Sequence, residues 1–351
     1  MFHLILTACI AGNSGICAPI LLPAGEAAEV ADCRAGAERS SSAWLAGHQG
    51  LEGAGVDCTD APPALPVDQI APGVFVHIGP VAQIGAENAG RIANLGFVVG
   101  DDAVAVIDAG GNRAEGQELY AAIRAVTDRP VTHLVLTHDH PDHMLGAAVF
   151  AEAGARIIGH PRLPDAIAAR GASFLDNLIR IAGPQAMAGT ALPHPVEPVP
   201  EGGAEIDLGG RVLSLVPVQV AHTQADLTVR DSGADVLFTG DLLFRGLTPV
   251  VDGSINGWLD WMAAPPLPEP TLIVPGHGPV AASWAEAAAM QETFLTALRE
   301  AVRSEIAFGT PMSAAVPAVG AAMAPLRGDW VDFDATVARD ATAAYKELEW
   351  E

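Results

Sequence analysis

Three histidines and two aspartates lie within seven residues, in the order Thr137-His138-Asp139-His140-Pro141-Asp142-His143. The cluster directly follows the apolar run 131–136, which is typical of a short buried strand, so it stands where a strand ends in a loop. Pro141 disfavours a helical backbone at His140, and side chains two apart on an extended backbone face the same way. His138 and His140 are therefore expected to point to one place, and Asp142 and His143 to a neighbouring one. This arrangement predicts two adjacent metal sites.

The composition indicates a large core and a strongly negative surface. The chain has 351 residues, 50% of them hydrophobic, which allows one large domain or one domain with an appendage. No apolar run reaches the roughly 18–20 residues of a membrane helix. The formal net charge is -24, and Lys346 is the only lysine. Such a field repels phosphates and argues against binding to nucleic acid or to an anionic membrane, although it equally serves to keep the protein in solution.

All cysteines fall within the first 58 residues, at Cys9, Cys17, Cys33 and Cys58. Their spacing contains no C-x-x-C pair, which disfavours a structural zinc site. Two disulfides that stabilise a small N-terminal segment are the better interpretation, and buried free thiols are the alternative. Three pairings are open on sequence alone. Disulfides in turn imply an oxidising compartment, so a periplasmic or exported protein is expected.

The first residues give little further indication of targeting. The apolar stretch 2–6 is short, and no basic residue precedes it, so it makes a poor signal peptide. Residues 6–9 (Leu-Thr-Ala-Cys) look like a lipoprotein cleavage box, but the apolar region before them is too short for one. The start of the sequence is compatible with trimming or with misassignment.

Alternating apolar residues and glycine-rich turns predict a mixed α/β fold after residue 66. A proline-rich linker at 61–66 is expected to separate an N-terminal cysteine-bearing segment, 1–65, from a larger domain, 66–351. Strands are expected at 74–78, 95–99, 103–108, 131–136, 156–160, 211–218, 227–230, 235–241 and 271–274. Helices are expected at about 113–126, 145–153, 163–181, 284–307 and 333–349. Strands that alternate with helices indicate sheets covered by outer helices.

Three further residues, His222, Asp241 and His277, stand where an apolar strand meets a loop rich in glycine, threonine or proline. A single histidine at a strand end is usually a surface or core residue. The combination is more informative, because H-x-H-x-D-H followed by these three features in order is difficult to reach by chance.

This set resembles the metallo-β-lactamase-fold hydrolases. Their five motifs are matched by Asp108, the cluster 138–143, His222, Asp241 and His277. The resemblance covers roughly residues 70–350 and implies an αβ/βα sandwich: two mixed sheets face to face, helices outside and metals at one edge. Within that superfamily, residues 72–77 and 345–349 look like the quinoprotein relay system zinc metallohydrolases, which are related to SoxH-type proteins. The N-terminal cysteine segment suits that branch.

The resemblance also implies a ligand set for two metal ions. It places His138, His140 and His222 on the first ion, Asp142, His143 and His277 on the second, and Asp241 between both. Imidazoles and carboxylates suit zinc, while iron or manganese remains compatible with a set of nitrogen and oxygen ligands. Asp108 matches the acid that supports a ligand in the family, and it can also stabilise the turn before Gly110 and Gly111.

Other candidates near these motifs are expected to lie outside the ligand set. His133 is expected to be a packed core residue, and Asp139, at the variable position of the motif, to point to solvent. His77 and His160 either line the site or cap strands.

The implied reaction is hydrolysis by a metal-bridging hydroxide on the carbonyl of an ester, a thioester, or a lactone or lactam. Two metal ions would lower the pKa of a shared water from about 15.7 toward 7, and Asp142 or Asp241 would take up a proton. Asp241 stands where the principal β-lactamases carry Cys or Ser, so lactam hydrolysis is not the first expectation, although a β-lactamase-like enzyme stays open. Glutathione thioesters would need basic residues, and the C-terminal region offers few: Arg299, Arg303, Arg327, Arg339 and Lys346.

The same residues also occur in proteins with other functions. The nuclease members share H-x-H-x-D-H, but the charge of -24 argues against that branch. A flavodiiron-type electron carrier is disfavoured because His140 stands where Glu is expected and no flavodoxin-like domain follows. The remaining alternative is a metal-binding accessory partner of a periplasmic quinoprotein or redox system, with little catalysis of its own.

Overall fold

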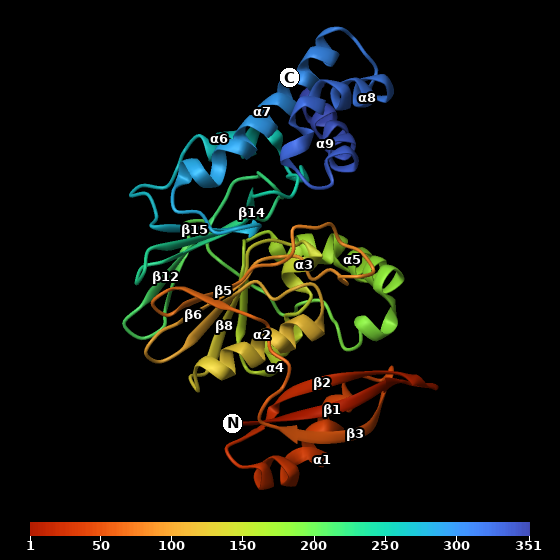
Figure 1. The fold of residues 1–351 in the computed structure, drawn as a ribbon, viewed down its shortest axis with the longest axis vertical. Helices are drawn as coiled ribbons and strands as arrows, with labels where there is room; N and C mark the ends of the chain where they lie inside the picture. Colours follow the sequence, from red (N-terminus) through yellow and green to blue (C-terminus); the bar gives the residue numbers. More distant parts are fainter.

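The structure, a computed structural model, describes the backbone of residues 1–351 and every side chain except that of Ser14. Three sheets follow one another along the long axis of the molecule, with the N-terminal sheet at one end and the C-terminal helices at the other (Figure 1). Among the described residues, no helix combines the length and the apolar character that crossing a membrane requires.

The N-terminal part is a small antiparallel sheet with one helix. The sheet has the order β2-β1-β3, and the helix α1 packs beside it. Its elements are β1 (Phe2–Ile10), β2 (Asn13–Ala27), α1 (Val30–Ala46) and β3 (Leu51–Thr59). Leu4, Leu6 and Ile20 of the strands pack against Cys33 and Trp44 of the helix and form a core of their own.

Two disulfides close this unit, which confirms the prediction of two bridges and excludes the free thiols. Cys9 pairs with Cys17 across β1 and β2, and Cys33 of α1 pairs with Cys58 of β3. None of the described cysteines is free. The fold selects this pairing from the three that the sequence left open, because Cys9 lies directly opposite Cys17 in the β1–β2 register, whereas the residue opposite Cys58 on β1 is Leu4.

Several side chains of α2 join the N-terminal unit to the main domain, among them Gln117, Tyr120 and the buried Arg113. Arg113 is fully buried, and its two terminal nitrogens donate to Glu152 at 2.7 and 2.6 Å. It also donates to the carbonyl of Leu21 in β2 at 3.1 Å and lies 5.0 Å from the ring of Trp44. The boundary at 61–66 between two domains stays a prediction.

Reduction offers a direct test of these bridges. The Cys33–Cys58 bridge spans 25 residues, against 8 for Cys9–Cys17. Loop-closure entropy gives about 3.5 kcal/mol for the longer loop and about 2.5 kcal/mol for the shorter. Cys33→Ser/Cys58→Ser should therefore lower the free energy of unfolding of the N-terminal unit more than Cys9→Ser/Cys17→Ser does, as measured by denaturant titration. An intact mass that does not rise on reduction would contradict both bridges.

The main domain contains a seven-stranded and a five-stranded sheet. The first has the order β10-β9-β8-β7-β6-β5-β4, and the second β11-β12-β13-β14-β15. The strands of the first are β4 (Asp68–Ala71), β5 (Val74–His77), β6 (Leu95–Val99), β7 (Val104–Ile107), β8 (Val131–Leu136), β9 (Arg156–Gly159) and β10 (Glu197–Pro198). Those of the second are β11 (Ala204–Asp207), β12 (Val212–Pro217), β13 (Leu227–Asp231), β14 (Val236–Phe244) and β15 (Leu272–His277).

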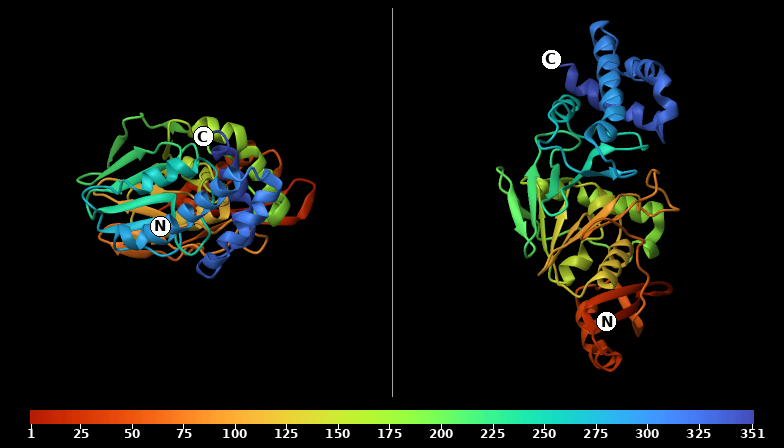
Figure 2. Two further views of the ribbon diagram at one scale, coloured as in Figure 1. Left: turned by 90° about the horizontal axis from the view of Figure 1, so that it is seen from above. Right: turned by 60° about the vertical axis from the view of Figure 1, so that its left-hand side comes forward.

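Helices cover the outer face of each sheet, as the second view of the fold also shows (Figure 2). The helices over the larger sheet are α2 (Arg113–Val126), α3 (Pro141–Met144), α4 (Ala148–Glu152) and α5 (Leu163–Ala186). Those over the smaller sheet are α6 (Ile255–Met262), α7 (Trp284–Ala307), α8 (Met312–Met323) and α9 (Phe333–Leu348), with a 3-10 turn at Ala324–Asp329.

Side-chain alternation explains the layers. In β7, Val104 and Val106 belong to the core under the helices, while Ala105 and Ile107 belong to the core between the sheets. All four are buried, as is expected of a strand covered on both faces. The resulting αβ/βα sandwich of two sheets with outer helices confirms the fold predicted from the sequence.

Several predicted boundaries were wrong. The helix expected at 145–153 covers only Ala148–Glu152, and a separate short helix, Pro141–Met144, precedes it. The two do not join, because the N–H of Gly146 donates to the carbonyl of Gly110 at 2.9 Å. The helix expected at 163–181 extends to Ala186 across a kink at Gly183. The sequence also missed α6 and α8; Pro317 and Gly320 inside α8 had obscured its helical pattern.

Candidate metal centre

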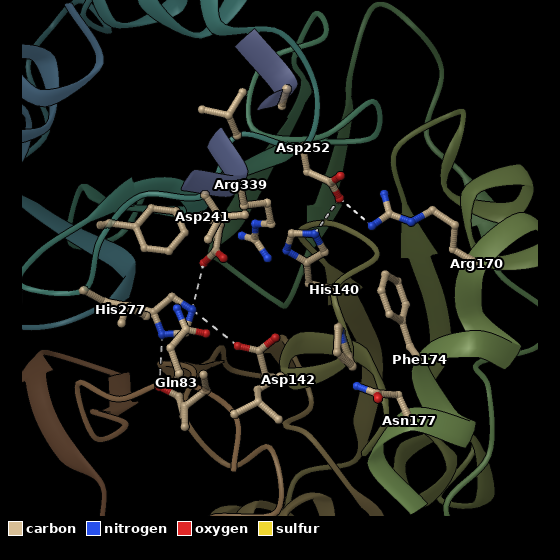
Figure 3. A pocket seen from close by; sticks show the side chains of 18 of the residues that line it. Gln83, His140, Asp142, Arg170, Phe174, Asn177, Asp241, Asp252, His277 and Arg339 are labelled. Carbon is tan, nitrogen blue, oxygen red and sulfur yellow. Dashed lines mark hydrogen bonds and ion pairs between the residues drawn. The ribbon is translucent and has the colours of Figure 1, made fainter. Parts of the chain in front are cut away.

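All seven residues predicted as ligands lie together at one edge of the sandwich. Figure 3 labels four of them: His140, Asp142, Asp241 and His277. The loop after β8 and the helix α3 carry four of them, the loop between β12 and β13 carries His222, and β14 and β15 carry Asp241 and His277. They form two groups in which the nitrogen and oxygen atoms lie within 4.8 Å of one another. The first group is His138, His140, His222 and Asp241, and the second is Asp142, His143 and His277.

The bend predicted at Pro141 accounts for the split of the motif into two groups. His140 has an extended backbone, with φ -73° and ψ 147°, and α3 begins at the next residue. Residues before the proline thus project from an extended chain, and Asp142 and His143 project from a helical turn.

Asp241 faces both groups, one oxygen to each. Its Oδ2 lies 3.6 Å from Nε2 of His138 and 3.5 Å from Nε2 of His222. Its Oδ1 lies 3.1 Å from Nε2 of His143 and 3.3 Å from Nε2 of His277. This is the geometry expected of a carboxylate shared between two ions.

Two glycines make room for that carboxylate. Sequence reasoning placed Asp241 and His277 at strand ends. His277 is the last residue of β15, as expected, but Asp241 lies inside β14, whose pairing with β15 shifts register around Gly240. Gly240 has φ +50°, and a Cβ there would lie 2.5 Å from Oγ1 of Thr137. A Cβ on Gly276 would overlap the Asp241 carboxylate. The strands can therefore run through the site only because these positions have no side chain.

Each of the five imidazoles is held by a contact on the side facing away from Asp241. Carbonyl oxygens of Val250 and Ile92 accept from Nδ1 of His222 at 2.7 Å and from Nδ1 of His277 at 3.1 Å. The carboxylate of Asp252 lies 3.0 Å from Nε2 of His140.

Asp108 and Thr137 hold the other two rings. Oδ2 of Asp108 accepts from Nδ1 of His143 at 2.7 Å and from Oγ1 of Thr137 at 2.8 Å, and Oδ1 accepts from the Thr137 N–H. Because the Thr137 hydroxyl donates to Asp108, it accepts from Nδ1 of His138 at 3.0 Å. Asp108 therefore supports a candidate ligand as well as the turn, the two roles that the sequence allowed together.

These outer contacts leave lone pairs directed inward. Nε2 of His222 and Nδ1 of His140 lie 3.1 Å apart. A neutral imidazole carries one proton, and when that proton is donated to Val250 or Asp252 on the outer side, the inner nitrogen has none. The two inner nitrogens then cannot form a hydrogen bond with each other. Nε2 of His138, Nε2 of His143 and Oδ1 of Asp241 are buried without a hydrogen-bond partner. Buried polar atoms are normally satisfied, so this cluster of unpaired acceptors fits cations at both groups.

Burial and nearby charges shift the pKa values of the histidines differently in the two groups. Burial and the neighbouring His143 hold the pKa of His138 well below its ordinary value, and burial with the charge of His140 lowers the pKa of His222 to about 3. In the second group burial acts in the same direction, but Asp241 and Asp142 outweigh it and raise the pKa of His277 to about 9. Asp241, Asp108 and Asp142 likewise raise the pKa of His143, against burial, well above its ordinary value.

Sequence reasoning missed the loop 250–252. It supplies the Val250 carbonyl to His222 and the Asp252 carboxylate to His140, and no local motif marks it. Burial raises the pKa of Asp252, but His140 and Arg170 outweigh it and hold that pKa well below its ordinary value. Arg170 lies 2.5 Å from Oδ2 of Asp252, the same oxygen that contacts Nε2 of His140, so the two side chains hold one carboxylate oxygen between them.

The prediction for Asp139 was wrong. Its side chain is only 2% exposed and lines a second cavity beside Arg162 and Gln224. The tight turn into α3 turns it inward, away from both ligand groups. His133 is half-buried rather than a core residue and lies 2.9 Å from the Thr132 hydroxyl. His77 and His160 belong to neither group.

A cavity of about 610 Å³ opens onto the two groups. His140, Asp142, Asp241 and His277 line its base. Helix α5 contributes apolar side chains to one wall, and helix α9 contributes another wall (Figure 3). The volume suits a small molecule of drug-like size.

Comparison with known proteins agrees with this geometry. A family described as the metallo-beta-lactamase superfamily matches residues 89–277, a range that contains all seven predicted ligands. No curated protein matches the chain by sequence.

Solved structures share the fold at low sequence identity. A metallo-beta-lactamase from Pontibacter korlensis superposes with a TM-score of 0.52 and 18% identity, covering 66% of this chain and 99% of that one. A beta-lactamase domain protein from Burkholderia ambifaria gives 0.60 and 19%, covering 83% and 90%. A mutant of the sec-alkyl sulfatase PisA1 gives 0.61 and 14%, covering 82% and 51%. Identities this low establish the fold alone.

Proposed function

This chain belongs to the metallo-beta-lactamase superfamily, and from that premise we propose that it is a two-metal hydrolase of esters, thioesters or lactone- and lactam-type carbonyls. The observation that carries the proposal is the placement of Asp241. Each of its carboxylate oxygens faces one of two groups of buried ring nitrogens, three of which have no hydrogen-bond partner or only another ring nitrogen. A purely structural cluster would leave these acceptors unsatisfied at a cost of about 1–3 kcal/mol each.

We propose His138, His140 and His222 as ligands of one ion, Asp142, His143 and His277 as ligands of the other, and Asp241 as the shared ligand. The ions, when bound, would act as Lewis acids and lower the pKa of a water toward 7. With only nitrogen and oxygen donors in the set, we propose zinc, and iron or manganese are the competitors that elemental analysis must exclude.

The chain's own groups would position the substrate and move protons. Asp142 lines the cavity, and burial raises its pKa while His143 and His277 outweigh burial and lower it, so it stays a carboxylate able to accept a proton. Hydrolysis breaks the bond between the acyl carbon and the leaving atom, and Asp142 is placed to hand that atom the proton it gains. Asp241 is also buried and would orient the four imidazoles that its carboxylate faces: His138, His143, His222 and His277.

Elemental analysis combined with a hydrolysis panel tests this function. Metal-loaded protein should contain two ions per chain and should hydrolyse at least one member of a set of esters, thioesters, lactones and lactams. Protein treated with chelator should lose that activity and regain it on reloading. Two bound ions without turnover of any carbonyl compound would refute the hydrolase and favour the accessory-partner alternative, above all if a quinoprotein co-purified.

The pH dependence of metal loading is a separate prediction. His277, with a pKa raised to about 9, carries a proton at pH 7, and the pKa of His143 is shifted in the same direction. An ion entering the second group must displace the proton of His277, so its apparent affinity should rise as pH increases from 6 to 8, by about tenfold per unit for each proton displaced. The first group should show a weaker dependence, because the pKa values of His138 and His222 are lowered and only that of His140 is raised, by Asp252 against burial. Calorimetry in buffers of different ionisation enthalpy counts the protons; zero release at pH 7 would contradict the assignment.

The finer placement in the quinoprotein relay branch is part of the same proposal. The disulfide-closed N-terminal unit supports this placement. On the same ground we propose export to an oxidising compartment, where disulfides persist. Localisation of the full-length protein in fractionated cells would test the compartment.

A further inference from the structure

The wall of the cavity formed by α9 carries two cations. Arg339, Thr342, Ala343 and Lys346 all line the cavity. Their spacing of three, four and seven residues places them on one face of the helix. Both charged side chains are exposed to solvent, and the side chain of Arg339 is 57% exposed.

No carboxylate neutralises these two charges well. Among the described residues, none lies within ion-pair distance of Lys346, and the acid next to it on the helix, Glu347, accepts from Ser254 and Ile255 instead. Arg339 has only Asp340, at 4.0 Å. Asp340 is fully buried and accepts from the Val251 N–H, and burial raises its pKa to about 8. At neutral pH it is mostly uncharged and offers Arg339 little.

The other basic residues of the C-terminal region are already paired. Arg299 contacts Glu300, Arg303 contacts Glu351, and Arg327 contacts Asp334. Within the C-terminal region, Arg339 and Lys346 are therefore the two described basic side chains that lack a strong carboxylate partner.

The opposite wall is apolar. Phe174, Leu178 and Ile181 of α5 line it. The one cation on that side, Arg170, is held by Asp252 and lies 4.8 Å from the ring of Phe174. The cavity is thus lined by candidate metal ligands at its base, by apolar side chains of α5 on one side and by two cations of α9 on another.

We propose that Arg339 and Lys346 bind an anionic group of the substrate at a place separate from the bond that is cleaved. The substrate class is then an acyl compound with an apolar body and a carboxylate or similar oxyanion at its far end. This inference rests on the proposed function of the same cavity, and it specifies what that function acts on.

Binding of hexane-1-sulfonate, compared with 1-hexanol, tests the inference without requiring turnover. The sulfonate carries a permanent charge and is a weak metal ligand, so the metal-loaded protein can be used. Ligand-observed NMR titration should show tighter binding of the sulfonate, and Arg339→Gln/Lys346→Gln should weaken it about tenfold, because two exposed ion pairs contribute about two- to fivefold each. Added salt screens exposed charges and should therefore also lower the affinity of the wild-type protein for the sulfonate.

A matched control removes two charges elsewhere. Arg34→Gln/Arg39→Gln lies on α1, at the opposite end of the molecule from α9 (Figure 1), and should bind the sulfonate as the wild type does. Equal sulfonate affinity in the wild type and the α9 double variant would overturn the inference, whatever the esters show.

A pair of esters extends the test to catalysis. Phenyl hexanoate and monophenyl adipate differ in the carboxylate at the far end of the acyl chain. The ratio of their kcat/KM values should favour the adipate in the wild type and fall about tenfold in the α9 double variant, since the lost contacts are the two ion pairs. If neither ester is cleaved while sulfonate binding still depends on α9, the hydrolase proposal fails and the anion site stands. If esters are cleaved but sulfonate binding is the same in the α9 double variant, the anion site fails and the hydrolase proposal stands.

Discussion

Asp241→Ala should lose both metal ions and turnover together. The carboxylate faces both ligand groups, so its removal takes away the one negative charge that they share and leaves His138 and His222 without an anion opposite. Two-metal stabilisation amounts to several kcal/mol, and each 1.36 kcal/mol is tenfold, so activity should fall on the order of 10³-fold or more. Elemental analysis and the best substrate of the hydrolysis panel measure the two losses side by side.

Two further variants separate charge from shape in this experiment. Asp241→Asn keeps one oxygen and the volume of the side chain but removes the charge, so it should retain less metal than the wild type and more than the alanine variant. Asp139→Asn changes the other buried aspartate of the 137–143 cluster, which belongs to neither group, and should keep its metal. A fully active Asp241→Ala protein with two ions would refute the ligand assignment.

Asp108→Asn should weaken metal binding at the second group by about 10–100-fold, as the loss of an outer carboxylate–histidine contact does. The carboxylate accepts from three donors, Nδ1 of His143 and both the N–H and the hydroxyl of Thr137. An amide supplies one oxygen and one NH2 group, so at least one of these donors faces another donor. The imidazole can then shift its proton to Nε2, which removes the lone pair that a metal ion needs.

The choice of asparagine matters for the backbone. Asp108 has φ +60°, a left-handed conformation that asparagine tolerates and most residues do not, so the variant tests the carboxylate rather than the turn. Asp226→Asn is the matched control. Asp226 holds Thr223 by the same pair of contacts, at 2.8 and 2.6 Å, but touches no candidate ligand of the second group. Competition with a chelating indicator should show a loss for Asp108→Asn and none for Asp226→Asn.

The comparison of these two aspartates shows where sequence reasoning succeeds. Asp108 was identified because it ends a strand at a family motif, and its contact with His143 follows from two neighbouring parallel strands, β7 and β8. Asp252 was missed because its contact with His140 spans 112 residues and joins two loops. Nothing in the local pattern around Asp252 distinguishes it from an ordinary turn residue.

The amino-acid sequence by itself determined the fold class, the number of disulfides and the seven residues that meet at the candidate metal centre. It could do so because spacing within residues 137–143 limits the direction of four of these side chains, and the resemblance to a known family adds His222, Asp241 and His277. The tertiary structure alone decided which cysteines pair, that Asp139 turns inward, that Asp241 lies inside β14, and that α9 brings Arg339 and Lys346 to the cavity. These features depend on the packing of elements far apart in the chain, for which local periodicity carries no signal.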